Sequence, residues 1–227
     1  MRGANAIRLT IHLLLSGVYA YISWFDYQII DFRYLPIPGQ FFSKCVWLTS
    51  LNLYAQLIHN IAGVHASIYG PWRYFHFLSR GIVGPLGISV CALFWALYLL
   101  EPNTLMAGDA GEMLRRMFWY NHGLHTFPVI CVLLDLLIWN HGQPTRKSTL
   151  LLISILSTIY VAGVHYVHSV SGFWAYPIIG QLPPLFRSLF LVACIIFTYL
   201  CFVVLSQVHY IFHGREYSSR TKVTKRH

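Results

Sequence analysis

The sequence is poor in charged residues, and above all in acidic ones. Only 10% of its 227 residues are charged, with seven Asp and Glu against 16 Lys and Arg, whereas a soluble domain carries about a quarter. At the same time 56% of the residues are hydrophobic, and the mean hydropathy is +0.56. A surface that faces lipid explains this shortage of charge. The basic excess is concentrated toward the C-terminal end and forms no basic face of a soluble domain, so we expect no nucleic-acid partner.

The sequence also lacks the motifs of the common soluble hydrolases and nucleotide-binding proteins. It contains no GxSxG nucleophile elbow, no P-loop, no GxGxxG after a strand and no HExxH. Its five cysteines form no CxxC pair and lie in or beside apolar segments, where single cysteines usually act as small hydrophobic residues. We therefore expect neither a disulfide framework nor a zinc ribbon.

Apolar segments long enough to cross a bilayer are abundant. A membrane helix needs about 20 mainly apolar residues, and six segments qualify, separated by short connections rich in Pro and Gly: Ile7–Trp24, Cys45–Tyr69, Gly81–Leu100, Met117–Trp139, Leu150–Val167 and Leu189–Phe212. This pattern predicts an all-α integral membrane bundle of about six transmembrane helices. We expect one domain over residues 1–212, followed by a basic cytoplasmic tail over 213–227.

The first apolar segment also has features of a signal peptide. Arg2 and Arg8 precede the apolar run, and the sequence 18–20 would serve as a cleavage site. The run continues past that point with Tyr21 and Trp24, which favours its retention as a helix.

The distribution of Lys and Arg predicts the orientation. If both termini lie on one side of the membrane, that side holds eleven of the 16 basic residues: Arg2, Arg8, Arg73, Arg80, Arg146, Lys147, Arg215, Arg220, Lys222, Lys225 and Arg226. The other side holds the remaining five: Arg33, Lys44, Arg115, Arg116 and Arg187. Cytoplasmic loops carry the basic excess. We therefore expect both termini in the cytoplasm, with the protein in the plasma membrane or the endoplasmic reticulum.

The fourth segment, Met117–Trp139, contains a group of polar residues: Asn121, His122, His125, Thr126 and Asp135. Such residues are costly at membrane depth, so they tend to face the bundle interior and suggest a functional site. His125 shares one helix face with Asn121 and His122 because of their spacing. Pro128 follows closely, cannot donate a backbone hydrogen bond, and predicts a kink.

Depth in the membrane brings His125 close to a threonine of the second segment. With the expected orientation, Thr49 lies about 6 Å and His125 about 12 Å below the outer surface. His165 and His168 of the fifth segment reach a similar level. Asp135 lies about 15 Å along the helix axis from His125, too far for a hydrogen bond. We expect it to be a helix-packing acid near the cytoplasmic end.

The residues themselves leave three chemistries open. Thr49 and His125 could be a nucleophile and its general base, because a threonine hydroxyl needs an adjacent base and histidine titrates near neutral pH. His122, His125, His165 and His168 could instead hold a metal or a haem. The polar groups could also simply form hydrogen bonds between or within helices.

Three motifs resemble those of a known family. They are Trp-Leu-Thr at 47–49, Asn-His-Gly-Leu-His-Thr at 121–126, and His-Ser-Val-Ser-Gly-Phe-Trp-Ala-Tyr-Pro at 168–177. In this order they are similar to the androgen-induced protein 1 family, which includes the androgen-dependent regulator of tissue factor pathway inhibitor. The likeness covers about Ile7 to Phe212. The run FFSKCVWLT before the threonine departs from the Gly-rich, Trp-Lys run common in the family, which puts substrate preference in question.

The resemblance implies a multi-pass membrane hydrolase of fatty-acid esters of hydroxy fatty acids, with Thr49 as nucleophile and His125 as base. Asp135 matches an acidic family position without an assigned role. We expect Asn121, His122 and His168 to support the base or bind substrate, and we expect no metal and no cofactor. The partners are then a lipid ester and the bilayer, with no obligatory protein partner. The alternative is a non-catalytic or metal- or haem-binding membrane protein.

Overall fold

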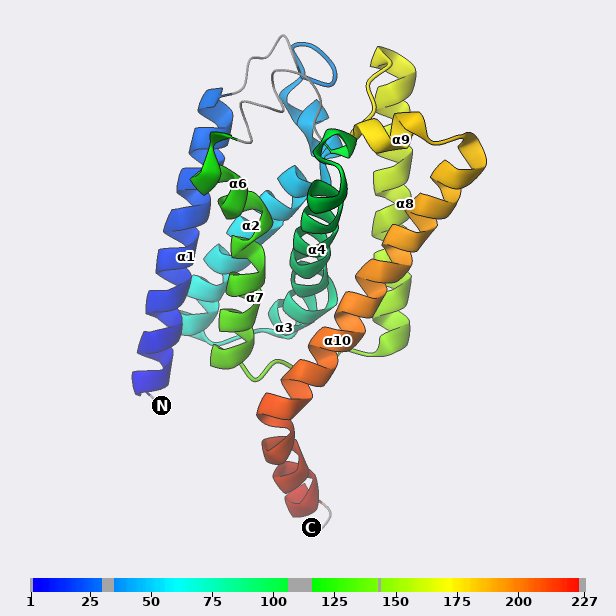
Figure 1. Cartoon of the computed structure of the whole chain (residues 1–227). Coiled ribbons are helices and arrows are strands. Elements are labelled where there is room, and N and C mark those ends of the chain that lie inside the picture. The colour runs from blue at the N-terminus through cyan, green and yellow to red at the C-terminus, as the bar shows by residue number, and fades with distance from the viewer. Residues whose placement is uncertain (1, 30–34, 106–115, 143, 225–227) are drawn as a thin grey trace.

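The computed structural model describes residues 2–29, 35–105, 116–142 and 144–224, and side chains as far as Gly214. Arg33, Arg115, Lys225 and Arg226, which enter the charge count, lie outside these ranges. The described ranges are helical, with no strand (Figure 1). The elements are α1 (Arg2–Ile29), η2 (Phe41–Val46), α2 (Leu48–Tyr69), α3 (Arg73–Leu78), η3 (Ser79–Val83), α4 (Gly84–Leu100), η4 (Pro102–Thr104), α6 (Phe118–His125), α7 (Phe127–Ile138), α8 (Arg146–Ser171), α9 (Pro177–Gln181) and α10 (Pro184–Thr224).

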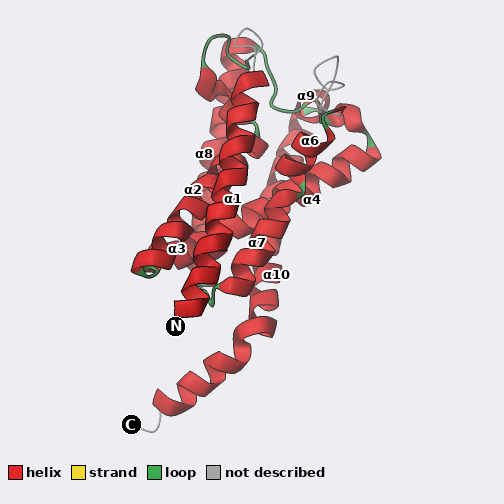
Figure 2. Ribbon diagram, turned by 90° about the vertical axis from the view of Figure 1, so that its left-hand side faces the viewer, coloured by secondary structure: helices red, strands yellow, loops and turns green. Residues whose placement is uncertain are grey.

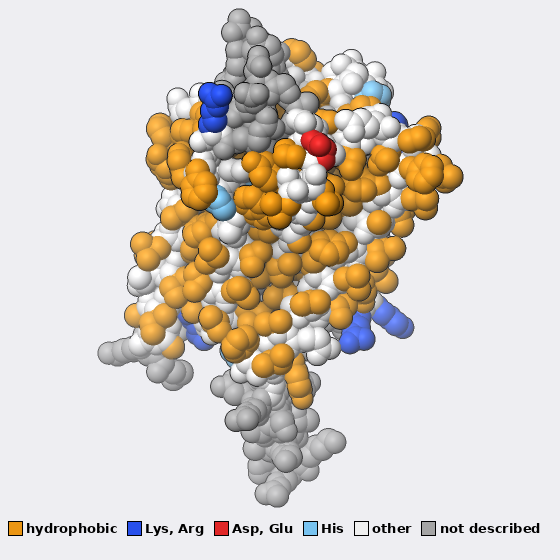
Figure 3. Space-filling view, viewed as in Figure 1, with side chains coloured by type: hydrophobic (Ala, Val, Ile, Leu, Met, Phe, Trp, Pro, Cys, Tyr) orange, Lys and Arg blue, Asp and Glu red, His pale blue; other side chains and the backbone are white. Residues whose placement is uncertain are grey.

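The predicted all-α membrane bundle is confirmed. Four helical runs are long and apolar enough to cross a membrane, and the bent pair α6–α7 makes a fifth if it counts as one span. The four are α1, the continuous run Arg73–Leu100, α8, and α10 as far as Gly214. Figure 3 shows apolar side chains over the middle of one face, with Lys and Arg near its ends. A belt of this kind fits the hydrocarbon region of a bilayer.

Helix α2 corresponds to a predicted membrane segment but is not among the helices that are both long and apolar enough to cross a membrane. It has 22 residues, which is long enough, but it carries several polar side chains. Asn52, Gln56 and Asn60 are almost fully buried. The polar face of α2 is therefore turned into the bundle, where its groups can find hydrogen-bond partners.

The third predicted segment begins earlier than expected, at Arg73 instead of Gly81. Helices α3 and α4 are joined by a π-helical turn, Ser79–Val83, which is closed by the Gly84 N–H bonding to the Ser79 carbonyl. Pro85 follows at the start of α4 and cannot donate a hydrogen bond. The wider turn accommodates this missing donor without ending the helix.

The two termini lie at the same end of the bundle (Figure 1). Helix α1 packs along α2, and α10 continues beyond the other helices (Figure 2). Since α10 runs without a break to Thr224, the expected boundary between residues 212 and 213 does not coincide with the end of a helix.

A buried ion pair at the opposite end fixes the beginning of α2. Lys44 on η2 is 1% exposed and pairs with Asp26 on α1. The second oxygen of Asp26 accepts a hydrogen bond from the Tyr120 hydroxyl on α6 at 2.6 Å. A buried pair that keeps its hydrogen bonds holds its elements in one arrangement. It ties α1 to η2, which leads into the helix of Thr49, and to α6, which carries His125.

Candidate functional site

Thr49 and His125 lie side by side, although 76 residues separate them in the chain. Thr49 is the second residue of α2, and His125 is the last residue of α6. The Thr49 hydroxyl oxygen lies 3.3 Å from Nε2 of His125. His125 is only 7% exposed, and Thr49 is half-buried. The structure therefore places the sequence-predicted pair within hydrogen-bonding contact.

A break in the fourth span positions His125. Helices α6 and α7 meet at an angle of 45° around Thr126, and Pro128 stands at the start of α7. The predicted proline kink is confirmed. The break leaves the His125 carbonyl free of the helix, and the indole Nε1 of Trp95 on α4 donates to it at 3.0 Å. Trp95 also donates to the Thr126 hydroxyl at 3.0 Å.

The hydrogen bonds of His125 determine which ring nitrogen carries the proton. Nδ1 lies 3.0 Å from the backbone oxygen of Asn121 and 2.8 Å from its side-chain oxygen. Both of these atoms are acceptors, so Nδ1 must be the donor. Nε2 then keeps its lone pair, which faces the Thr49 hydroxyl. The ring also stacks on Phe94 of α4, with centroids 3.4 Å apart and planes 5° from parallel. His125 is thus held in the tautomer and orientation that a general base needs.

The other two predicted supporting residues lie in different surroundings. Nδ1 of His122 lies 2.9 Å from the Thr126 hydroxyl, one helical turn further along. The ring of His168 stacks on Trp174, with centroids 3.8 Å apart. Among the described residues, His168 has no hydrogen bond to Thr49 or His125, and its Nδ1 is buried without a partner. His122 therefore neighbours the pair, whereas His168 contacts the loop after α8.

The Thr49 hydroxyl opens onto an apolar pocket. The pocket encloses about 90 Å³, room for several water-sized groups. Its lining comes from α2, α4, α8, α9, α10 and the turn at Leu105: Leu48, Thr49, Val90, Leu93, Phe94, Leu97, Leu105, Tyr160, Tyr176, Ile178, Ile179, Phe190, Leu191 and Cys194. No charged side chain is among these lining residues. A hydroxyl at the edge of such a pocket is suited to meet an apolar molecule with one polar group.

Tyr176 is a polar residue of the site that sequence reasoning did not single out. Its hydroxyl oxygen accepts a hydrogen bond from the Leu48 N–H at 2.9 Å and is also in hydrogen-bonding contact with Thr49. Burial raises the pKa of Tyr176 above its ordinary value, and these hydrogen bonds oppose the shift. The phenol is therefore neutral at physiological pH and remains a proton donor. The signal was present, because Tyr176 belongs to the third motif.

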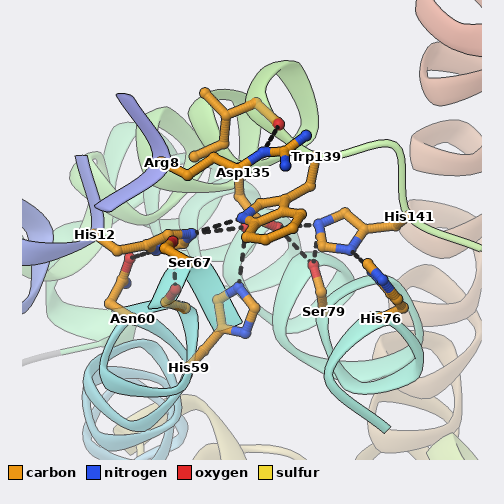
Figure 4. A network of polar contacts seen from close by, with 12 residues as sticks. Arg8, His12, His59, Asn60, Ser67, His76, Ser79, Asp135, Trp139 and His141 are labelled. Atoms are coloured by element: carbon orange, nitrogen blue, oxygen red, sulfur yellow. Dashed lines mark hydrogen bonds and ion pairs between the residues drawn. The ribbon is translucent and has the colours of Figure 1, made fainter. Parts of the chain in front are cut away.

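A second polar cluster surrounds Asp135 on α7 (Figure 4). One carboxylate oxygen accepts from the Ser79 hydroxyl at 2.5 Å and pairs with Nε2 of His141 at 2.8 Å. The other lies 3.2 Å from Nε2 of His59. The expectation that Asp135 packs helices together agrees with this arrangement. Ser79 and His141 were not expected as partners, because they come from a predicted helix edge and a predicted loop.

The histidines considered for a metal or haem divide into two separate groups. His122 and His125 contact aromatic residues of α4, whereas His165 and His168 contact Trp174. Over the described part of the chain, no three His, Cys, Asp or Glu side chains are arranged so that they could hold a metal ion.

Comparison with known proteins gives a match over nearly the whole chain. The sequence profile of the FAR-17a/AIG1-like proteins matches residues 7–210. The human androgen-induced gene 1 protein is 31% identical over 106 residues, which are 47% of this chain and 44% of that protein. The human androgen-dependent TFPI-regulating protein is 26% identical over 98 residues, 43% of this chain and 42% of its own length. A UPF0641 membrane protein of Schizosaccharomyces pombe is 26% identical over 165 residues, 71% of this chain and 73% of that protein.

The matched segments span about half the length of the androgen-related relatives. No solved structure matches the chain.

Proposed function

The chain belongs to the FAR-17a/AIG1-like family of membrane proteins, and on this basis we propose that it hydrolyses lipid esters within the membrane. The observation that carries the proposal is the contact between Thr49 and His125. A threonine hydroxyl is a weak nucleophile unless a base takes its proton. Here the lone pair of His125 Nε2 faces that hydroxyl at 3.3 Å, and Asn121 holds the proton on Nδ1. This is the arrangement that activates a hydroxyl nucleophile.

The reaction proceeds in two halves. Nε2 of His125 takes the Thr49 proton while the threonine oxygen attacks the ester carbonyl carbon. The bond to the alcohol oxygen then breaks, and the departing alkoxide takes the proton back from His125. An acyl-threonine remains. Water attacks it in the second half, with His125 again accepting and returning a proton, and releases the acid.

The apolar pocket supports a lipid as the substrate. An acyl chain can lie among residues such as Leu97, Ile179 and Leu191, with its carbonyl at Thr49. Burial of apolar chain contributes about 0.8 kcal/mol per methylene. The family resemblance narrows the proposed substrate to fatty-acid esters of hydroxy fatty acids. In this scheme Asn121 orients the base, His122 supports the turn at Thr126, and His168 supports the loop after α8.

The proposal is tested by labelling membranes with a fluorophosphonate activity probe, together with an assay of ester hydrolysis. We expect the wild-type chain to be labelled, and expect Thr49→Ala and His125→Ala to lose both labelling and turnover at equal expression. Thr158→Ala is the matched control, because that hydroxyl lies on α8 and bonds to the Ser154 carbonyl. It should behave as wild type. Equal labelling and turnover in Thr49→Ala and wild type would show that Thr49 is not the nucleophile.

A further inference from the structure

The hydroxyl of Tyr176 occupies a special position at the beginning of α2. The first amides of a helix have no acceptor within the helix. The N–H of Leu48 donates to the Tyr176 oxygen at 2.9 Å, and the amide of Thr49 is also in hydrogen-bonding contact with it. Tyr176 therefore takes up two helix-terminal donors immediately beside the nucleophile.

Among the described residues, no backbone carbonyl accepts the proton of Tyr176. The neighbouring Tyr160 uses its own proton to donate to the Val46 carbonyl at 2.7 Å. The hydroxyls of Tyr160 and Thr49 are also in hydrogen-bonding contact with the Tyr176 oxygen, and both contacts lower its pKa, as bonds that the oxygen accepts do. The Tyr176 hydroxyl can therefore donate its own proton to a ligand, and an anionic oxygen is a better acceptor for it than a neutral hydroxyl.

The beginning of α2 makes Tyr176 a stronger donor. Hydrogen bonds accepted by a hydroxyl oxygen polarise its O–H bond, and the effect is larger at low local dielectric. The amides at a helix N-terminus also carry partial positive charge. The Tyr176 O–H is therefore polarised toward the pocket that Thr49 and Tyr176 line together.

We propose that Tyr176 is a third catalytic residue, which donates a hydrogen bond to the ester carbonyl oxygen as Thr49 attacks; this inference rests on the proposed hydrolase function. When the bond from the Thr49 oxygen to the carbonyl carbon forms, the π electron pair moves onto the carbonyl oxygen, and the threonine proton moves to His125. Tyr176 stabilises the resulting oxyanion and keeps its own proton throughout. When the pair returns, the bond to the alcohol breaks, and His125 supplies the proton to that alcohol.

The loop that carries Tyr176 is held by contacts on both sides. Gly172 ends α8 with a φ of 73°, a backbone conformation that favours glycine. Trp174 is stacked by His168, and the Arg187 guanidinium lies 4.3 Å from its ring centroid. Arg187 also donates to the Ile179 carbonyl at 2.7 Å, which fixes α9. Fixed donors stabilise an oxyanion without reorganisation during the reaction.

The test compares Tyr176→Phe with Tyr19→Phe in purified full-length protein. Tyr19→Phe also removes a tyrosine hydroxyl, from a fully buried side chain in the core between α1 and α7. Loss of one oxyanion donor lowers kcat by about 10²–10³. We expect a fall of that size for Tyr176→Phe with little change in KM, and wild-type kinetics for Tyr19→Phe. Thr49→Ala, measured in parallel, reports on the hydrolase function itself.

Two inhibitors separate a catalytic role from a structural one. A trifluoromethyl ketone analogue of the substrate forms an oxyanion on the nucleophile, whereas an ether analogue offers no carbonyl. Tyr176→Phe should weaken binding of the ketone by about the same factor by which it lowers kcat. Binding of the ether should stay unchanged. Replacing Tyr176 by a fluorinated tyrosine keeps the ring and strengthens the hydrogen-bond donor, so it should tighten binding of the ketone. This variant also tests the inference if Tyr176→Phe does not fold.

Three results would overturn the inference. Wild-type kcat and ketone affinity in Tyr176→Phe would remove Tyr176 from the reaction and leave the Thr49–His125 function intact. Equal weakening of ketone and ether would assign Tyr176 a structural role. Hydrolysis that survives in Thr49→Ala would show that Thr49 is not the nucleophile, which overturns the proposed mechanism and this inference together.

Discussion

At the scale of single residues, Asn121 fixes the proton on Nδ1 of His125 through its backbone and side-chain oxygens. Asn121→Ala removes only the side-chain acceptor, so His125 keeps the backbone bond but loses half of its support. We expect kcat of ester hydrolysis to fall about tenfold, less than the factor of about 10²–10⁴ that a positioned acid–base group itself contributes, with KM unchanged.

Asn103→Ala is the control for this measurement. Asn103 lies in the exposed turn η4, where its side chain bonds only locally to Glu101. A fall in turnover in both variants would mean that the loss comes from expression or folding and not from weaker support of His125. A wild-type kcat in Asn121→Ala would mean that the backbone oxygen alone holds the tautomer.

Helix rise placed Thr49 and His125 in the same part of the membrane, because both lie on regular helices, and the family resemblance then singled them out as a pair. The same reasoning could not find Tyr176 or His141, since each lies in a segment outside the predicted helices. Their positions depend on tertiary contacts, namely the hydrogen bond between Tyr176 and the Leu48 N–H and that between His141 and Asp135. Asp135 itself was correctly separated from His125 by distance along the helix, but its partners could not be read from its own segment.

At the scale of elements, the close approach of α1 and α2 depends on Gly63. A Cβ atom at this position would lie 2.4 Å from the His12 ring. His12 is fully buried and is held by Asn60 on one nitrogen and Trp139 on the other. The ring has no room to withdraw, so overpacking is the expected consequence.

Gly63→Ala should lower the stability of the purified protein by about 1–3 kcal/mol, the usual cost of overpacking. The measurement is the free energy of unfolding of the detergent-solubilised protein, with heat or denaturant as the perturbation. Gly163→Ala on α8 is the matched control, because a Cβ there meets nothing within 4 Å, and alanine is the better helix former by about 1 kcal/mol. Opposite signs for the two variants support the packing described here; equal shifts contradict it.

The six apolar segments were predictable from composition, but the character of two was not. The polar face of α2 lowers its mean hydropathy below that of a typical membrane helix, and burial alone explains why it is tolerated. The early beginning at Arg73 also escaped prediction. The stretch around Trp72 and Arg73 is polar enough to be taken for a loop, whereas in the structure a helix begins at Arg73 and Phe75 is buried against His59.

At the scale of the whole molecule, both termini lie at one end of the bundle and η4 at the other (Figure 1). The basic excess predicts that the terminal end is cytoplasmic. An epitope tag at either terminus should be inaccessible on intact cells and become accessible when only the plasma membrane is opened with digitonin. A tag inserted after Asn103 should differ from both. Antibody should reach it on intact cells if the protein lies in the plasma membrane, or only after all membranes are dissolved if it lies in the endoplasmic reticulum. Terminal tags that are labelled on intact cells would reverse the proposed orientation.

The π-helical turn at Ser79–Val83 amounts to one extra residue threaded into an otherwise regular helix. Each α-helical residue turns the chain by about 100°, so a regular α-helix with the same number of residues would rotate α3 by about that angle relative to α4. Ser79 would then no longer point at Asp135, and Phe75 would leave the His59 ring that it covers. The polar cluster thus depends on the π-helical turn as much as on composition, because the same side chains on a regular α-helix could not assemble it.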